Sequence, residues 1–298
     1  MFLSVIIPTR GRAASCRATL CSVLRQKIPP DEIIISATEP ADWGDAPPDQ
    51  SVSIVFGAKG LTRQRNRGIA ALDRRCRIVT MLDDDVELPE DYFLKVRELF
   101  SKHPDIVLSF GSVREMPGAN RDQAAQALAE WEGGARFSDG ARGLGCSMSI
   151  RRDVLDRVKF DERLPLYGWL EDADFAARCR HLGRQGVSEA CRTVHLVEPK
   201  ARLSGVRFGF SQVMNPFYLW QKGTLPLREL LINHWIKGAG SNVVGLIRRD
   251  HQIDRWGRLR GQCKALWMIF QGQTEPEYVE QFEDPAPEPA EAGLLNKA

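Results

Sequence analysis

The chain has 298 residues, of which 43% are hydrophobic and 27% are charged, and its formal net charge is +2. This composition is typical of a folded globular protein, and it excludes a disordered or fibrous chain. A near-neutral chain of this kind also does not look like a nucleic-acid-binding protein.

The first half of the chain predicts strands and helices in alternation. Apolar runs rich in β-branched residues, which are typical of buried parallel strands, cover 2–7, 32–36, 52–56, 77–82 and 106–110. Helical patterns fill the intervals at 13–26, 60–73 and 90–103. The alternation predicts an α/β fold with a Rossmann-like, mostly parallel sheet flanked by helices. In such sheets, ligands bind beyond the carboxyl ends of the strands.

The pattern changes after residue 116. Helices are expected at 121–131, 153–158 and 171–182, and short strands at 146–150 and 193–197. From residue 206 the chain is mostly helical, with interruptions expected at Gly223, Gly238 and Gly240. The acidic, Pro-rich segment 283–298 predicts a disordered tail.

Three consecutive carboxylates, Asp83, Asp84 and Asp85, follow the strand 77–82. Strand geometry places Asp83 and Asp85 on one face, where their repulsion favours a divalent cation. Oxygen ligands suit Mg²⁺ or Mn²⁺, which usually share protein carboxylates with substrate phosphates. A helix cap is the structural alternative, but one aspartate suffices for a cap. We therefore predict a metal–phosphate site here.

A second acidic cluster, Glu171, Asp172 and Asp174, opens a predicted helix. Asp172 is a candidate general base, because a carboxylate in a dry cleft can accept a hydroxyl proton. Tyr167 and Trp169 precede the cluster and are candidates for a wall against a sugar ring. The alternative is helix capping by acids of the first turn.

Two further segments are candidates for nucleotide binding. The helix start at 60–68 carries Arg65 and Asn66 and two other arginines, which suits a diphosphate, although a solvated basic face is the alternative. The loop with Pro8, Thr9 and Arg10 follows the first strand, at the edge where a base is expected to bind. It lacks the Gly-x-Gly-x-x-Gly fingerprint, which argues against a nicotinamide-binding site.

Taken in order, these motifs resemble the inverting glycosyltransferases of family 2, which have the GT-A fold. The resemblance runs from residue 4 to about 222 and rests on five segments: 4–10, 60–68, 83–85, 145–152 and 171–174. It implies a metal-dependent transfer of a sugar from a nucleotide-sugar donor to a hydroxyl of a glycan or lipid-linked acceptor. The divalent cation it implies is Mn²⁺ or Mg²⁺.

The resemblance also implies roles for individual residues. Asp172 is expected to be the catalytic base, and Glu171 and Trp169 to orient or bind the acceptor. Asp85 and His195 are expected at the metal, although a lone His is more often structural. The nucleotide is expected to contact Pro8, Thr9, Arg10, Arg65, Asn66, Asp83 and Asp84. Family members often carry an acidic run after the second strand, where here only Glu39 is available to hold the base, so the donor's base stays open.

Three regions are expected: a catalytic domain at 1–205, a basic, Trp-rich helical extension at 206–282, and the tail at 283–298. Residues 199–270 carry 12 Lys and Arg but 3 acids. Basic helices with Trp suit an anionic membrane surface, and packing on the catalytic domain is the equal alternative.

Seven cysteines without a Cys-x-x-Cys pair, and no long apolar run, predict a cytoplasmic protein, peripheral at the inner face of the membrane if the helices bind it. Two other functions stay open. One is a nucleotidyltransferase that makes nucleotide-sugars, and the other is a non-catalytic carbohydrate-binding or scaffold protein on the same fold.

Overall fold

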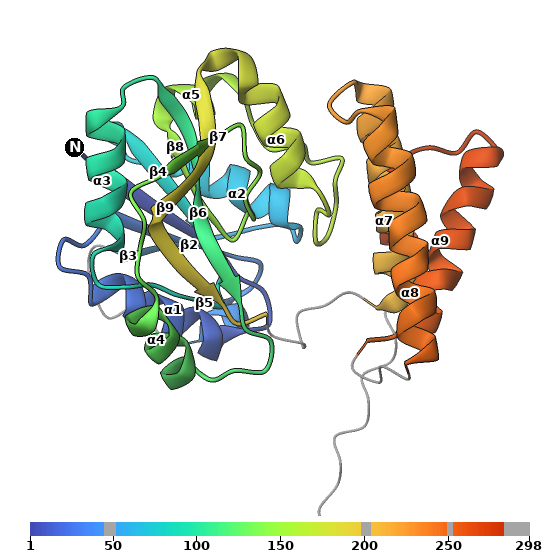
Figure 1. Cartoon of the computed structure of the whole chain (residues 1–298), viewed down its shortest axis with the longest axis horizontal. Helices are drawn as coiled ribbons and strands as arrows, with labels where there is room; N and C mark the ends of the chain where they lie inside the picture. Colours follow the sequence, from blue (N-terminus) through green and yellow to red (C-terminus); the bar gives the residue numbers. More distant parts are fainter. Residues whose placement is uncertain (45–51, 198–203, 249–252, 283–298) are drawn as a thin grey trace, which may run out of the picture.

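A computed structural model describes residues 1–44, 52–197, 204–248 and 253–282 of the chain. A sheet with helices on both sides extends to residue 195, and a group of helices follows it (Figure 1). The predicted tail, 283–298, lies outside the described residues. Among the helices that are described, none is both long and apolar enough to cross a membrane.

A nine-stranded sheet forms the centre, in the order β3-β2-β1-β4-β8-β6-β9-β5, with β7 paired to β9. The strands are β1 (Leu3–Pro8), β2 (Glu32–Ala37), β3 (Val52–Phe56), β4 (Ile78–Leu82), β5 (Val86–Glu87), β6 (Ile106–Glu115), β7 (Phe137–Asp139), β8 (Ser147–Arg151) and β9 (Arg184–His195). The first four strands in this order are parallel, as the apolar runs predict.

Helices cover both faces of the sheet, because the strand period of two sends alternate side chains to opposite sides. Val5 and Ile7 of β1 pack in one buried cluster with residues of α1 and α3, and Ile6 packs in the other with residues of α2, α5 and α6. These helices are α1 (Ala13–Leu24), α2 (Leu61–Ala70), α3 (Tyr92–Lys102), α5 (Arg152–Arg157) and α6 (Glu171–Cys179). The predicted α/β class is confirmed.

The second half of the sheet differs from the sequence pattern. β8 enters antiparallel between β4 and β6, and β9 is much longer than the strand expected at 193–197. Its first half is polar in sequence, but it is paired to β6 on one side and to β7 on the other. The first half of β9 is therefore a strand because of its hydrogen-bonding partners and not because of the β-propensity of its residues. Helix α4 (Arg121–Glu130) lies against this part of the sheet.

The helical extension consists of α7 (Gly205–Lys222), the π-helical segment η4 (Glu229–Ile236), α8 (Lys237–Ile247), α9 (Arg255–Phe270) and the 3₁₀ segment η5 (Pro276–Gln281). Gly223 ends α7 with φ +83°, as predicted. The interruptions expected at Gly238 and Gly240 are wrong, because α8 passes through both. A glycine inside a helix costs only about 1 kcal/mol, which the helix contacts offset.

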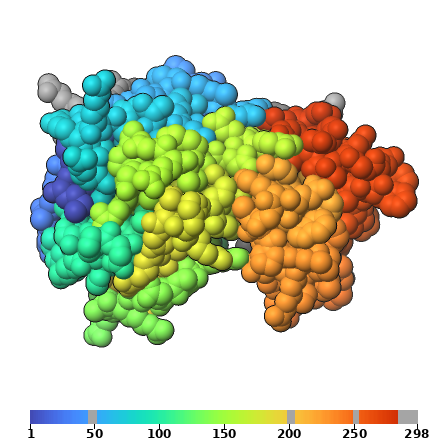
Figure 2. All heavy atoms as spheres, turned by 90° about the horizontal axis from the view of Figure 1, so that it is seen from above, coloured from blue at the N-terminus to red at the C-terminus, as the bar shows by residue number. Residues whose placement is uncertain are grey.

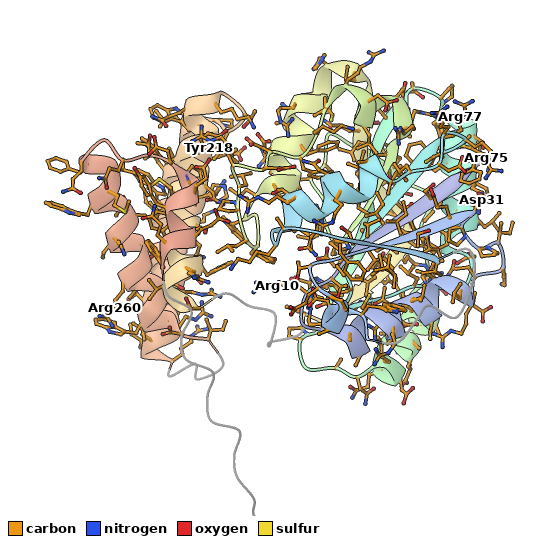
Figure 3. All side chains as sticks on the ribbon, turned by 180° about the vertical axis from the view of Figure 1, so that it is seen from behind. Arg10, Asp31, Arg75, Arg77, Tyr218 and Arg260 are labelled. Atoms are coloured by element: carbon orange, nitrogen blue, oxygen red, sulfur yellow. The ribbon has the colours of Figure 1, made fainter. Side chains whose placement is uncertain are left out.

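Side chains of α7 connect the extension to the part of the chain that contains the sheet. Lys222 bonds Asp161 at 2.6 Å and Asp174 of α6 at 2.9 Å, and Tyr218 donates to Asp161 at 2.8 Å. Figure 2 shows the orange and red extension packed directly against the yellow-green segment around α6, and Figure 3 places Tyr218 on the side of α7 that faces it.

We expect Lys222→Ala to lower the free energy of unfolding by about 1–3 kcal/mol. Asp174 is buried, so the change removes a cation from a carboxylate that water does not reach, a loss of 3–5 kcal/mol in a fully buried pair. Partial exposure of Lys222 and the bonds that Arg178 and Thr224 make to Asp174 reduce this value. Denaturant unfolding measures it, with Lys102→Ala as a surface control expected to stay within about 0.5 kcal/mol.

Candidate functional site

Two of the three aspartates after β4 share one arginine. Asp84 is buried, accepts a hydrogen bond from Thr9 Oγ1 at 2.7 Å and contacts the Arg12 guanidinium. Asp85 is also buried and binds Arg12 Nη1 at 2.9 Å. Burial raises the pKa of Asp84 to about 7, although Arg12 beside it opposes the shift. The guanidinium of Arg12, which lies four residues after β1, therefore offsets part of the negative charge of these two neighbouring carboxylates.

His195 reaches these aspartates through strand pairing. The short strand β5 directly follows Asp85 and pairs with the end of β9, so that Val86 lies opposite His195. His195 Nε2 lies 3.1 Å from Asp85 Oδ1. Burial lowers the pKa of this imidazole, but its hydrogen bonds to Asp85, Cys146 and Glu115 together raise it above its ordinary value. Ligand atoms of Asp83, Asp85 and His195 all lie within 4.8 Å of one another.

This trio fits a divalent cation in its donor chemistry. It offers two carboxylates and one imidazole, and carboxylates are the ligands that Mn²⁺ and Mg²⁺ prefer. The carboxylates come from the end of a buried strand, so the fold fixes their spacing. In the structure Arg12 and His195 supply the positive partners of Asp85.

Asp172 lies in the first turn of α6. Its Oδ2 accepts from Gly145 N at 2.8 Å, and its Oδ1 accepts from Ala173 N at 2.7 Å. Burial raises the pKa of Asp172 above its ordinary value, while Arg65 and these two N–H groups lower it. The carboxylate is thus held in a fixed orientation in a poorly solvated position.

Arg65 and the segment Gly145–Cys146 connect Asp172 with the aspartates that follow β4. The buried Arg65 binds Glu171, lies 3.4 Å from Asp83 and donates to Gly145 O at 2.9 Å. Cys146 O in turn accepts from Asp83 N at 3.1 Å. Burial raises the pKa of Glu171, and the Arg65 guanidinium opposes this shift. The two acidic clusters, 88 residues apart between Asp84 and Asp172 in sequence, therefore form one site.

An aromatic group lies next to α6. Tyr167 and Trp169 stack with ring centroids 6.5 Å apart, and Phe208 of α7 meets Trp169 edge-on at 5.2 Å. The backbone that carries them is strained, because Leu166 and Leu170 have φ values of +57° and +71°. Asn215 of α7 donates to Trp169 O at 2.9 Å and Leu166 packs in the core of the extension.

The structure brings most of the predicted site residues together, with two exceptions. Pro8 ends β1, and Thr9 follows it and donates to Asp84. Arg10 is exposed on the side that faces the extension (Figure 3). The Asn66 amide instead bonds Phe160 O and Glu162, away from the aspartates. Glu39 is exposed, and its backbone N–H donates to Asp42 Oδ2 at 3.1 Å.

Sequence reasoning missed Arg12, Asp42 and Phe208. Asp42 is buried and accepts hydrogen bonds from Gly11 N at 2.6 Å and Thr38 N at 2.8 Å, so it shapes the loop after β1. The 3₁₀ turn η1 (Pro40–Asp42) that positions it has a readable signal in Pro40. No local pattern indicates that Arg12 turns back to Asp84 and Asp85, or that α7 delivers Phe208.

A comparison with protein families matches residues 4–158 to the model of glycosyl transferase family 2. Asp172 and His195 lie beyond the matched segment. No curated protein matches the sequence.

Solved structures are similar in fold. The mannosyltransferase PcManGT from Pyrobaculum calidifontis, in complex with GDP-Man and Mn²⁺, matches with a TM-score of 0.55 and 17% identity, over 93% of this chain and 84% of its own. S. aureus TarS matches with a TM-score of 0.49 and 17% identity over 74% of this chain. This chain covers 40% of that TarS chain.

Proposed function

This chain belongs to glycosyl transferase family 2 and is a glycosyltransferase of the GT-A fold, and on that premise we propose that it is metal-dependent and inverting. The proposed reaction moves a sugar from a nucleotide-sugar donor to a hydroxyl of a glycan or lipid-linked acceptor. The family assignment favours this reaction over a nucleotidyltransferase or a non-catalytic scaffold.

One observation carries the proposal. Two acidic groups with different environments lie side by side, joined by Arg65 and by the backbone of Gly145–Cys146. Asp83 and Asp85 with His195 offer ligands for a cation, and Asp172 is held by backbone N–H groups in a half-buried position. A donor diphosphate and an acceptor hydroxyl require these two kinds of group next to each other.

In the proposed mechanism Asp172 accepts the proton of the acceptor hydroxyl. The hydroxyl oxygen bonds the anomeric carbon from the face opposite the diphosphate, and the bond from that carbon to the diphosphate oxygen breaks. One displacement of this kind inverts the configuration. A divalent cation held by Asp83, Asp85 and His195 supplies Lewis-acid stabilisation of the diphosphate charge when it is bound.

The donor nucleotide contacts Pro8, Thr9, Arg10 and Asp83 at the carboxyl ends of β1 and β4. Arg65 acts as a positioning residue, because its guanidinium is occupied by Glu171, Asp83 and Gly145. The mannosyltransferase of similar fold, which holds GDP-Man and Mn²⁺, supports a nucleotide-sugar donor and Mn²⁺ here as well.

The acceptor side is proposed at Trp169, Tyr167 and Glu171. The stacked rings give a flat apolar surface on which a sugar ring can lie, and Phe208 adds a third ring. Residues 1–205 then form the catalytic domain and 206–282 an extension that completes the acceptor side. We place the protein in the cytoplasm, at the inner face of the membrane when its acceptor is lipid-linked.

A thermal-shift screen of UDP, GDP, dTDP and CMP, each with and without Mn²⁺, tests the proposed function. Ligand at 100 times its dissociation constant stabilises the folded state by about 2.7 kcal/mol. We expect one nucleotide to raise Tm only with Mn²⁺, and a sugar conjugate of that nucleotide to be the donor. The proposal fails if every nucleotide leaves Tm unchanged with Mn²⁺.

We expect Gly145→Ala to lower kcat about 10–100-fold with little change in Tm. A Cβ at this position would lie 3.0 Å from Asp172 Cβ and 3.1 Å from Asp172 Oδ2, so the carboxylate must shift by a few tenths of an ångström. Misplacement of a catalytic group by up to about 1 Å costs as much as 10²-fold. Gly240→Ala, at a helical site with open space around it, is the matched control, and equal losses in both variants would contradict the role of Asp172.

We expect the acidic limb of the kcat/KM profile to lie at a higher pH than the pKa of an ordinary exposed aspartate. Burial raises the pKa of Asp172 from 3.8, and a general base acts only when it is deprotonated, so protonation begins at a higher pH than in an exposed aspartate. A pH profile at saturating Mn²⁺ measures the acidic limb. A limb that remains at the pKa of an exposed aspartate would contradict the assignment.

A further inference from the structure

Exposed apolar side chains are concentrated on the helical extension. Of the 18 large hydrophobic residues that are exposed in the described part of the chain, 12 lie between 227 and 270. They are Leu227, Leu231, Ile232, Ile236, Val243, Val244, Leu246, Ile247, Trp256, Leu266, Trp267 and Phe270. Scattered exposed apolar residues are normal in globular proteins, but a concentration of this kind marks an interaction surface.

On α9 the exposed residues form one stripe. At 100° per residue, Trp256, Arg260, Trp267 and Phe270 fall on the same side of the helix. Trp256, Trp267 and Phe270 are 61%, 60% and 82% exposed, and the rings of Trp267 and Phe270 stack at 5.9 Å. In Figure 3 Arg260 lies at the outer edge of the extension, away from the catalytic part. We call this stripe the outer face of α9.

The helix α8 has a similar stripe. Ile236, just before α8, and Val243 and Ile247 within it, are separated by seven and four residues, which places them on one side, and they are 67%, 45% and 76% exposed. In water, side chains of this size are covered in most folded proteins, because each buried methylene contributes about 0.8 kcal/mol. The exposed stripe is therefore suited to a partner.

The positive charge of α8 and α9 indicates which kind of partner this surface binds. Residues 230–248 and 255–273 contain no Asp or Glu, and they carry Lys237, Arg248, Arg255, Arg258, Arg260 and Lys264. A second copy of the same surface would bring like charges together, because a symmetric interface pairs each patch with itself. An anionic surface with an apolar interior suits both the charge and the exposed rings.

We propose that the outer face of α9 and the stripe of Ile236, Val243 and Ile247 at α8 bind the surface of an anionic lipid bilayer. Trp256 and Trp267 lie at the level of the headgroups, Phe270 and Ile247 enter the acyl boundary, and Arg260, on the same side of α9, contacts lipid phosphates. The same extension contacts the catalytic part through Asn215 and Phe208 at the Trp169 loop. The inference rests on the proposed function in one respect only, which is the proposal that the hydroxyl acceptor is lipid-linked.

Co-sedimentation of the full chain with vesicles tests the proposal. We expect binding to vesicles of phosphatidylcholine and phosphatidylglycerol, weakened by salt, and little binding to phosphatidylcholine alone. Arg260→Glu removes one positive charge and adds one negative charge, each worth about fivefold in partitioning, so we expect binding to fall about 25-fold. The pair Trp267→Ser and Phe270→Ser is expected to lower binding at least about tenfold.

Two control variants carry the same chemical changes elsewhere. Arg77→Glu reverses an exposed charge at the opposite end of the molecule (Figure 3), and Phe56→Ser removes an exposed ring of β3. Both are expected to bind vesicles like the unaltered chain. Equal losses in the control and test variants would overturn the proposal, because binding would then depend on total charge or on general hydrophobicity.

Nucleotide binding with Mn²⁺ and analytical ultracentrifugation are measured for every variant. If the unaltered chain binds nucleotide but no vesicle, the membrane inference fails and the proposed function stands. If the chain is a dimer that Arg260→Glu or the Trp267/Phe270 variant dissociates, the face is a contact between copies and the proposal is wrong. Vesicle binding lost only in the outer-face variants, with nucleotide binding kept, supports it.

Discussion

We expect Asp172→Asn to lower kcat about 10³-fold while donor binding changes less than about twofold. An amide has nearly the shape of the carboxylate and still accepts from Gly145 N or Ala173 N, so the turn keeps its conformation. It does not accept the acceptor proton, and general-base catalysis contributes about 10²–10⁴-fold. Single-turnover transfer rates and calorimetric titration with the donor nucleotide measure the two effects separately.

The matched control for this experiment is Asp156→Asn, which removes an exposed carboxylate paired with Arg152. It is expected to transfer at the rate of the unaltered enzyme. The base assignment is wrong if Asp172→Asn retains more than about a tenth of the transfer rate, since general-base catalysis would then be supplied by another group.

We expect Asp85→Asn to abolish the effect of Mn²⁺ on donor binding and to weaken binding at least about 100-fold. Residues that only support a metal ligand typically cost 10–100-fold, and Asp85 is proposed as a ligand itself. The loss follows because one of two carboxylates in the trio of Asp83, Asp85 and His195 disappears. Calorimetric titration of nucleotide with and without Mn²⁺ gives the two affinities.

Asp84→Asn is a sharp control, since it makes the same chemical change at the next residue. The Asp84 oxygens face Thr9 and Arg12, and the residue is not part of the trio. Donor binding in this variant should still respond to Mn²⁺. The same loss of the Mn²⁺ effect in both variants would show that net charge, and not ligation by Asp85, controls donor binding.

The parts of the fold that could be predicted are those in which the pattern is local. The runs at β1, β2 and β4 are continuous and β-branched, so burial on both faces follows from composition. β9 could not be predicted in full, because its polar first half is ordered by pairing with β6 and β7. These pairing strands lie far away in sequence, and the local strand propensity of a segment gives no information about them.

The candidate site likewise has parts that could be predicted from the sequence and parts that could not. Asp83 to Asp85 and Glu171 to Asp172 are visible as clusters, and the structure brings them together. The connection through Arg65 and Gly145 is not visible, since it joins residues 106 and 27 positions from their partners Glu171 and Asp172. Nor does the sequence show that Asn66 turns to residues 160–162, because a helix start places neighbouring side chains on different sides.

The left-handed turn at Leu166 and Leu170 affects the order in which the parts of the enzyme fold. Each of these residues adopts a conformation that costs about 1–2 kcal/mol, and side chains of α7 hold the turn in place through Trp169 and the core around Leu166. A ribosome synthesises α7 only after all the strands of the sheet. We therefore expect the sheet and its aspartates to fold first, and the carboxylate of Asp172 to reach its final position only when the last third of the chain has docked.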